Sequence, residues 1–260
     1  MSYKMVVSFQ IEDDTFRTSL NSIHDMFISQ YTNEVEKPKA IHHFVNNETF
    51  DIKNEIDKIR YSDYIRNTLL SQHQDLKYVF NVEEMDEIYY FFPRFTGIAK
   101  VNGVDPHKDG IYRLSSNQIL YRVLIGLTIN SDIKTCFDRC YTISKHEIVA
   151  FDYNNDLHYV EGSNSSNTKR LLLKVHFIVS KTPNIQWFKH FHIWYANYTR
   201  KNMEYAQNLE NESDKTVFDR VYLWCVLHAS WFNLYLYHII FIIIFIIIVI
   251  FTIVIYTRYK

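Results

Sequence analysis

Glycine and proline are scarce in this chain, and their scarcity excludes several classes of protein. The 260 residues include 5 glycines and 4 prolines, far below the usual share of about 12% for the two together. Collagen-like chains and disordered chains rich in these residues are therefore excluded. No GxGxxG or GxxxxGK[ST] segment occurs, which argues against the common glycine-rich phosphate loops.

An excess of one charge is also lacking. The chain has 28 basic and 29 acidic side chains and no basic stripe, so we expect no nucleic-acid partner. Its three cysteines, Cys136, Cys140 and Cys225, do not form the disulfide framework of a small secreted protein. We therefore expect free thiols at Cys136 and Cys140 and a reducing compartment. The first sixteen residues hold no long apolar run, so no signal peptide is expected.

One long apolar run is present, in residues 239–255, where Thr252 is the only polar residue. The wider stretch 234–256 would form a helix of roughly 34 Å at 1.5 Å per residue, and the hydrocarbon core of a bilayer is ~30 Å thick. A buried core helix is the alternative, but the run has no polar face and isoleucine is an indifferent helix former. We predict a single-pass anchor over 233–256, a short tail over 257–260, and a remainder that faces the cytosol. The positive-inside rule favours the opposite orientation, with Arg258 and Lys260 on the cytosolic side.

The rest of the chain changes from mixed to β and then to helical texture. A strand is expected over 5–11 and a helix over 54–70. From residue 79 onward, short runs rich in Tyr, Phe, Ile and Val predict strands over 88–92, 97–101, 119–129, 147–151 and 170–179. We divide this part into an N-terminal mixed and helical region (1–75), a β core (76–185), and a helical aromatic region with a polar linker (186–232).

The predicted strand 170–179 has two different faces, because successive side chains alternate in a strand. One face is wholly apolar, and the other carries Arg170, Lys174 and His176. An outer strand would place that polar face in water, whereas a barrel strand would line a pocket for an anion with it. The alternation alone leaves both readings open.

Three short elements carry residue types that suit a metal site. His107 and Asp109 form an HxD pair whose side chains point the same way in an extended segment. His158 follows in a strand-turn segment, and Arg170 opens the strong β run. Two imidazoles and one carboxylate form the facial triad of non-haem Fe(II) oxygenases, and an Arg fork binds a carboxylate bidentately.

The order of these elements resembles a known family. An HxD pair, a β stretch, "VAFDYNNDLHYV" and "KRLLLKVHFIV" are together similar to the Fe(II)/2-oxoglutarate-dependent dioxygenases, most of all to the prolyl 4-hydroxylase-like and aspartyl/asparaginyl hydroxylase-like branches. The resemblance covers residues 89–180, under half of the chain. It implies a mainly β fold with flanking helices, a double-stranded β-helix or jelly-roll barrel.

The resemblance also implies site residues and cofactors. His107, Asp109 and His158 would match the Fe(II) ligands, and Arg170 would match the anchor of the 2-oxoglutarate C5-carboxylate. O₂ would be the co-oxidant, and ascorbate is left open as an auxiliary reductant. The spacing from His158 to Arg170 is longer than the family's usual spacing, and the prolyl hydroxylases place Lys there, so Lys169 and, less well placed, Lys174 are rivals. Tyr121 and Arg122 are further candidates for the pocket.

The implied activity is hydroxylation of a C–H bond in a protein side chain or a lipid, coupled to decarboxylation of 2-oxoglutarate to succinate. A catalytically inactive membrane or viral envelope protein that keeps the barrel as a binding module is the alternative, and the Asn- and Ile-rich composition fits an AT-rich genome such as that of a large DNA virus. A cupin-type hydrolase or isomerase would share the barrel but would not need Arg170. A second histidine pair, His190 and His192, has aromatic neighbours and is expected to pack or to form an interface.

Overall fold

The computed structural model describes residues 6–31, 40–91, 106–110, 115–162, 169–210, 215–227 and 245–246. The chain divides into two compact units, Met1–Lys201 and Asn202–Lys260. The first unit contains both β-sheets and the predicted site residues. The predicted strand over 97–101 lies outside the described residues.

A seven-stranded sheet forms the centre of the first unit. Its main strand order is β1-β8-β5-β10-β4-β2, and β3 pairs with the end of β10. All pairings are antiparallel. The strands are β1 (Val7–Gln10), β2 (Ala40–Phe44), β3 (Tyr78–Asn81), β4 (Glu87–Phe91), β5 (Gln118–Gly126), β8 (Glu147–Asp152) and β10 (Arg170–Ser180).

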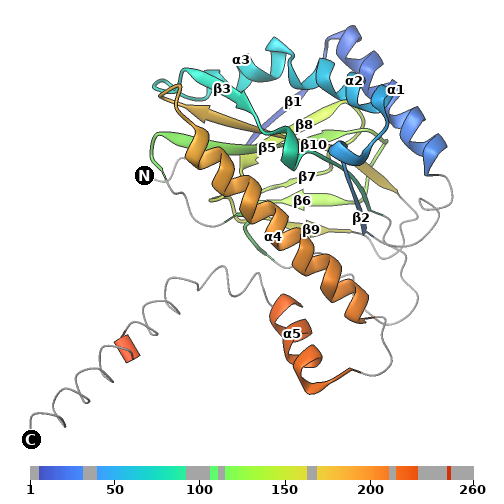
Figure 1. Cartoon of the computed structure of the whole chain (residues 1–260). Helices are drawn as coiled ribbons and strands as arrows, with labels where there is room; N and C mark the ends of the chain where they lie inside the picture. Colours follow the sequence, from blue (N-terminus) through green and yellow to red (C-terminus); the bar gives the residue numbers. More distant parts are fainter. Residues whose placement is uncertain are drawn as a thin grey trace, which may run out of the picture. The chain divides into compact units, whose positions relative to one another are not determined.

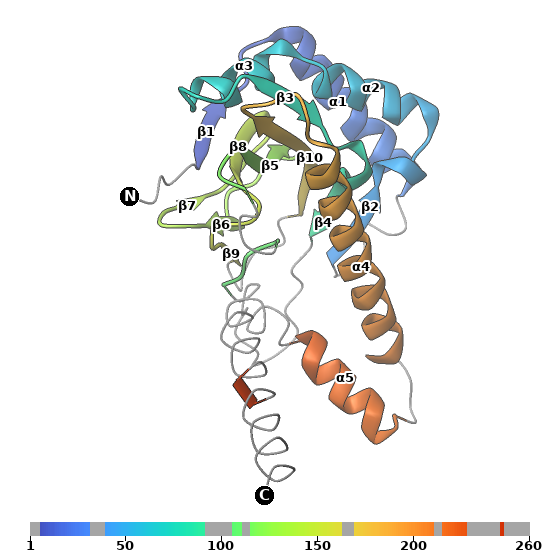
Figure 2. The same ribbon diagram turned by 60° about the vertical axis from the view of Figure 1, so that its left-hand side comes forward.

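A three-stranded sheet with the order β7-β6-β9 lies on one side of the large sheet (Figures 1 and 2). Its strands are β6 (Lys134–Cys136), β7 (Cys140–Tyr141) and β9 (Tyr159–Glu161). Tyr89, Leu124, Val149, Phe151 and Leu172 fill the space on this side of the large sheet. Two facing antiparallel sheets with flanking helices agree with the predicted jelly-roll-like class.

Three helices cover the other side of the large sheet (Figures 1 and 2). They are α1 (Asp14–Gln30), α2 (Phe50–Arg60) and α3 (Asp63–Ser71), and single 3₁₀ turns follow β2 (Val45–Asn47) and β3 (Glu83–Met85). The apolar helix faces and the odd-numbered residues of β5 and β10 form one continuous core. This core explains the strict alternation in β10: Leu171 and Val175 face the helices, whereas Arg170 and Lys174 face the space between the sheets.

The single helix predicted over 54–70 is wrong in its extent, because two helices occupy this region. Helix α2 ends at Arg60, and Ser62 caps α3 by accepting a hydrogen bond from the Tyr64 N–H at 3.2 Å. Serine competes for backbone hydrogen bonds within a helix but stabilises its first turn. The apolar spacing continues through the break because both helices pack on the same sheet.

Helix α4 (Gln186–Glu210) begins shortly after β10, and its early residues pack on the even-numbered face of β5 and β10. Phe188 contacts a small cluster that includes Leu120 and Ile178. His192 is fully buried among aromatic rings, 4.4 Å from the Phe188 ring between centroids, and His190 is exposed. The expected packing role is confirmed for His192.

The second unit contains the end of α4 and α5 (Val217–Leu227), where Tyr222 Oη donates to Asn202 Oδ1 at 2.8 Å. Of the predicted anchor over 233–256, the structure describes only Phe245 and Ile246, so this prediction lies almost wholly outside the described residues. None of the helices that the structure does describe is long and apolar enough to cross a bilayer.

Candidate metal and cosubstrate site

His107 and His158 are brought together by the backbone. They form an isolated antiparallel bridge in which each N–H donates to the other's carbonyl oxygen at 2.9 Å. Directly opposed residues of an antiparallel pair project their side chains to the same side. The two imidazole centroids are therefore only 4.5 Å apart, although the residues are distant in the sequence.

Asp109 completes a cluster with the two histidines. One of its carboxylate oxygens, Oδ1, lies 3.6 Å from His107 Nε2, and the other, Oδ2, lies 3.3 Å from His158 Nε2. One ligand atom from each of the three residues lies within 4.8 Å of the others. The structure therefore gathers the three residues predicted as iron ligands into one group.

The turn between β8 and β9 orients His158. Asp152 Oδ1 accepts from the Asn154 N–H at 2.9 Å, and Asp156 Oδ2 accepts from the Asp152 N–H at 2.8 Å, as aspartates commonly do in turns. His158 Nδ1 lies 3.2 Å from the Asp156 carbonyl oxygen. Because a carbonyl only accepts, Nδ1 carries the proton and Nε2 keeps its lone pair for a metal.

The electrostatics of the cluster suit metal binding. Burial, only partly offset by Asp109, lowers the pKa of His158 to about 4, so its ring is neutral at pH 7. Burial alone would raise the pKa of Asp109, but Arg122 and His158 bring it well below its usual value. Arg122 Nη1 is 2.7 Å from Asp109 Oδ2. At neutral pH the cluster therefore offers the ionised Asp109 carboxylate and the neutral His158 imidazole to a metal.

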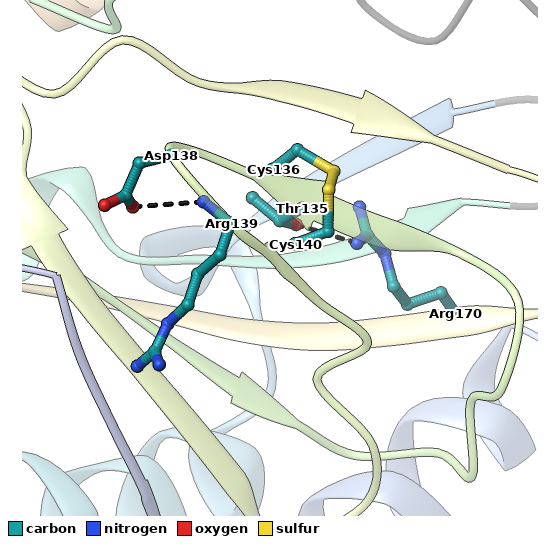
Figure 3. The surroundings of a disulfide bond; sticks show 6 residues. All are labelled: Thr135, Cys136, Asp138, Arg139, Cys140 and Arg170. Atoms are coloured by element: carbon teal, nitrogen blue, oxygen red, sulfur yellow. Dashed lines mark hydrogen bonds between the residues drawn. A yellow bond between two sulfur atoms is a disulfide. The ribbon is translucent and has the colours of Figure 1, made fainter.

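Arg170 is fully buried at the start of β10, and it connects to the cluster through the small sheet. Its Nη1 donates to Thr135 Oγ1 at 2.9 Å, and burial lowers its pKa to about 10. Two residues after Thr135, the Phe137 ring lies 5.7 Å from the His158 ring between centroids. Figure 3 shows the Arg170 guanidinium reaching Thr135 next to a disulfide between Cys136 and Cys140.

This disulfide contradicts the expectation of free thiols. Cys136 and Cys140 oppose each other in the β6–β7 hairpin, with Cα atoms 3.9 Å apart. The sequence has no repeated cysteine pattern that signals such a bond, because it depends on the hairpin pairing. These two cysteines therefore give no support for a reducing compartment.

The other predicted pocket residues lie in different places. Tyr121 does not face the cluster: it lies in the core beneath the helices, and its hydroxyl is 2.7 Å from His73 Nε2. Since side chains alternate along β5, Arg122 faces the cluster and Tyr121 cannot. Lys169 is half-buried just before β10, and Lys174 is paired with Glu87, with Nζ 2.5 Å from Oε1.

Comparison with family models and with curated proteins finds no match. Prolyl hydroxylases are among the solved structures that this chain resembles. The viral collagen prolyl hydroxylase of Paramecium Bursaria Chlorella virus-1 is 13% identical, with a TM-score of 0.40 over 68% of this chain and 91% of that one. HygX from Streptomyces hygroscopicus, solved with nickel and 2-oxoglutarate bound, is 9% identical, with a TM-score of 0.48 over 67% of this chain and 82% of that one.

Three contributing residues escaped the sequence analysis. Asp156 acts through its carbonyl oxygen, which no side-chain pattern reveals. Thr135 and Phe137 lie on or beside β6, a three-residue strand too short for alternation to be read. What the described residues present is a donor set of two imidazoles and a carboxylate, which suits Fe(II) with open positions, and a buried arginine with a hydroxyl beside it.

Proposed function

We propose that this protein is an Fe(II)/2-oxoglutarate-dependent oxygenase with a double-stranded β-helix core. The convergence of His107, Asp109 and His158 is the observation that carries the proposal. When bound, Fe(II) with 2-oxoglutarate and O₂ supplies the oxidising chemistry that couples decarboxylation to succinate with hydroxylation of a C–H bond. The substrate class we propose is a protein side chain or a lipid.

In this proposal His107 and His158 each hold the metal through Nε2, and Asp109 holds it through its carboxylate. His158 is preset for this role by its Nδ1 hydrogen bond to the Asp156 carbonyl oxygen. The rings of Phe137 and Phe151 pack against His158, with centroids 5.7 and 4.8 Å away. These rings exclude water from one side of the ligand and limit its rotation.

Arg170 and Thr135 would hold the C5-carboxylate of 2-oxoglutarate. A planar guanidinium donates two parallel hydrogen bonds to a carboxylate, and the Thr135 hydroxyl can turn to donate a third. The buried charge of Arg170 favours a dianion that brings compensating charge into the space between the sheets. The half-buried Lys169 has no comparable enclosure.

We also propose, from the apolar sequence alone, that residues 233–256 anchor the protein in a bilayer with the catalytic unit on the cytosolic side. Tethering would raise the local concentration of membrane-bound substrates. Protease accessibility of the first unit in sealed membrane vesicles tests the orientation. Release of the full chain from membranes by alkaline carbonate would contradict the anchor.

The proposed activity is tested by succinate formation. The full chain is purified anaerobically, loaded with Fe(II) and exposed to 2-oxoglutarate and O₂. We expect the wild type to form succinate by uncoupled turnover, in which 2-oxoglutarate is decarboxylated without a substrate to hydroxylate. We expect His158→Ala to form none above background. His190→Ala, which changes an exposed histidine on α4, is the matched control and should behave as wild type. Equal succinate formation by wild type and His158→Ala would contradict the proposal.

A further inference from the structure

A series of polar side chains, buried from His176 to Arg60 and half-buried at Asp109 and Arg122, runs from Asp109 to α2. Arg122 Nη1 contacts Asp109 Oδ2 at 2.7 Å, and Arg122 Nε donates to His176 Nε2 at 2.9 Å. His176 Nδ1 lies 3.1 Å from Asp86 Oδ1. Asp86 Oδ2 accepts from Arg60 Nε at 2.9 Å and lies 2.8 Å from Arg60 Nη2. After Asp109, the side chains of this series come from β5, β10, the turn before β4 and α2.

Each hydrogen bond in this series has one defined donor and one defined acceptor. The Arg122 Nε–H can only donate, so His176 Nε2 must accept and His176 Nδ1 must carry the proton. His176 then donates to Asp86, which accepts further hydrogen bonds from Arg60 and from the His176 backbone N–H at 2.8 Å. Burial and the adjacent Arg122 hold the pKa of His176 well below its usual value, so the ring stays neutral. The Arg122 guanidinium is therefore held at its Nε end by a single arrangement of donors and acceptors.

The sheet fixes Arg122 more firmly than the loop fixes Asp109. Arg122 pairs directly with His176 across β5 and β10 and with Phe151 across β5 and β8. Its guanidinium also lies over the Tyr153 ring, 4.7 Å from the centroid. Asp109 lies outside the regular strands, in a segment held by the bridge at His107 and by the Gly110 N–H, which donates to the Tyr153 carbonyl oxygen at 3.0 Å. The rotation of its carboxylate must be set by side chains.

We infer that Arg122 is a positioning residue that holds the Asp109 carboxylate in its metal-binding orientation, and that His176 and Asp86 hold Arg122. The inference rests on the proposed function, because Asp109 is a ligand only if a metal binds. It assigns to Arg122 a role toward the metal ligand in place of the 2-oxoglutarate contact predicted from the sequence. It also gives the buried His176 and Asp86 a shared purpose.

Arg122 has two opposing effects on the binding of a dication, and positioning is the larger of the two. A guanidinium charge close to the site repels a metal ion, so its removal would tighten binding if charge decided. A lost outer contact to a ligand typically weakens metal binding by about 10- to 100-fold. If positioning decides, Arg122→Met weakens binding by that factor, and Arg122→Lys, which keeps the charge but not the Nε contact to His176, gives an intermediate loss.

The test is an anaerobic titration of the full chain with Co²⁺, followed by its visible absorption and by calorimetry. Arg220→Met, at an exposed position on α5, is the matched control and should bind as wild type. We expect Arg122→Met to bind at least about 10-fold more weakly with a changed visible spectrum. His176→Phe keeps an aromatic ring but removes both hydrogen bonds, and it should weaken binding in the same direction by a smaller factor.

The outcomes separate this inference from the proposed function. If the wild type binds no Co²⁺, or if His158→Ala binds Co²⁺ as tightly as the wild type, the proposed function fails and the inference fails with it. If wild-type binding requires His158, but Arg122→Met binds as tightly as wild type or more tightly, positioning by Arg122 is overturned and the metal site stands. If Arg122→Met does not fold by near-ultraviolet circular dichroism, the pair Arg122→Lys and His176→Phe decides by the same measurement, and unchanged affinity in both overturns the inference.

Discussion

His107 and His158 exchange both of their backbone hydrogen bonds, at 2.9 Å each, so the spacing of the two proposed ligands is set by main chain. A side chain substituted at either position would still be presented at this place. The backbone therefore holds positions 107 and 158 side by side whichever side chains they carry. The site depends on the residues that let these two segments approach each other.

Gly110 is the residue most sensitive to this approach. A Cβ at this position would lie 2.6 Å from Tyr153 Cδ1 and would also meet Asn154 Oδ1. We expect Gly110→Ala to destabilise the fold by about 1–3 kcal/mol, the usual cost of overpacking, and to weaken metal binding because the HxD segment must shift. Urea unfolding and Co²⁺ titration measure the two effects. A variant with wild-type stability and affinity would show that this contact is not tight.

Arg170 and Lys169 are adjacent candidates for the 2-oxoglutarate anchor, and they can be compared directly. We expect Arg170→Ala to weaken 2-oxoglutarate binding to the Co²⁺-loaded protein much more than it weakens Co²⁺ binding. Lys169→Ala should bind 2-oxoglutarate nearly as wild type. Calorimetric titration gives both constants, and a larger loss from Lys169→Ala would reverse the assignment.

Thr135 supports the same arginine. Thr135→Val keeps the shape but removes the acceptor for Arg170 Nη1, and a lost buried partner of a charged group costs about 1–3 kcal/mol. We expect lower unfolding free energy and weaker 2-oxoglutarate binding from this variant. Thr142→Val, at a half-buried position in the same region, is the control. Wild-type 2-oxoglutarate affinity in Thr135→Val would remove Thr135 from the proposed site.

The Cys136–Cys140 disulfide closes the hairpin that carries Thr135 and Phe137. With a sequence separation of 4, loop closure of this size contributes about 2 kcal/mol in the chain-entropy model. We expect the Cys136→Ser/Cys140→Ser double variant to lose about this amount and to bind 2-oxoglutarate more weakly. Thermal unfolding and calorimetry check this, with tris(carboxyethyl)phosphine treatment of the wild type as an independent route. An unchanged affinity would mean that the hairpin holds its shape without the bond.

His192 makes stability depend on pH. Burial lowers its pKa in the folded state to about 4, whereas the unfolded chain has an ordinary value of about 6.5. Between these values the unfolded chain binds a proton that the folded chain does not, so this residue's contribution to stability falls as the pH falls from about 6.5 to about 4. The slope attributable to it is at most about 1.4 kcal/mol per pH unit. The difference between wild type and His192→Phe in urea unfolding across this range isolates the effect, and parallel curves would contradict it.

The sequence predicted those parts of the fold where one face of an element is uniformly apolar. The strand expected over 170–179 is observed as Arg170–Ser180, and the strand expected over 147–151 as Glu147–Asp152. The strand expected over 119–129 ends earlier, at Gly126, where a Cβ would meet the Ser144 backbone carbonyl oxygen. Such an end is set by a segment distant in the sequence, so periodicity cannot find it.

The ordered motifs predicted that His107, Asp109 and His158 would lie together, because their residue types and spacing are distinctive. Tyr121 and Arg122 were both predicted pocket residues, but adjacent residues of a strand face opposite sides, and Tyr121 faces the helices. Arg122 was found, but its contact with His176 depends on the β5–β10 register. Thr135, Phe137 and the disulfide lie in a hairpin of two very short strands, where no periodic signal develops.

The central claim is that His107, Asp109 and His158 hold one ferrous ion in reach of a 2-oxoglutarate bound by Arg170. Anaerobic titration of the full chain with Fe(II) and 2-oxoglutarate tests this claim most directly. The account predicts a weak visible charge-transfer band at one equivalent of metal, its loss in His158→Ala, and a higher 2-oxoglutarate requirement in Arg170→Ala. A wild-type protein that shows no such band, or a band of equal intensity in His158→Ala, would contradict it.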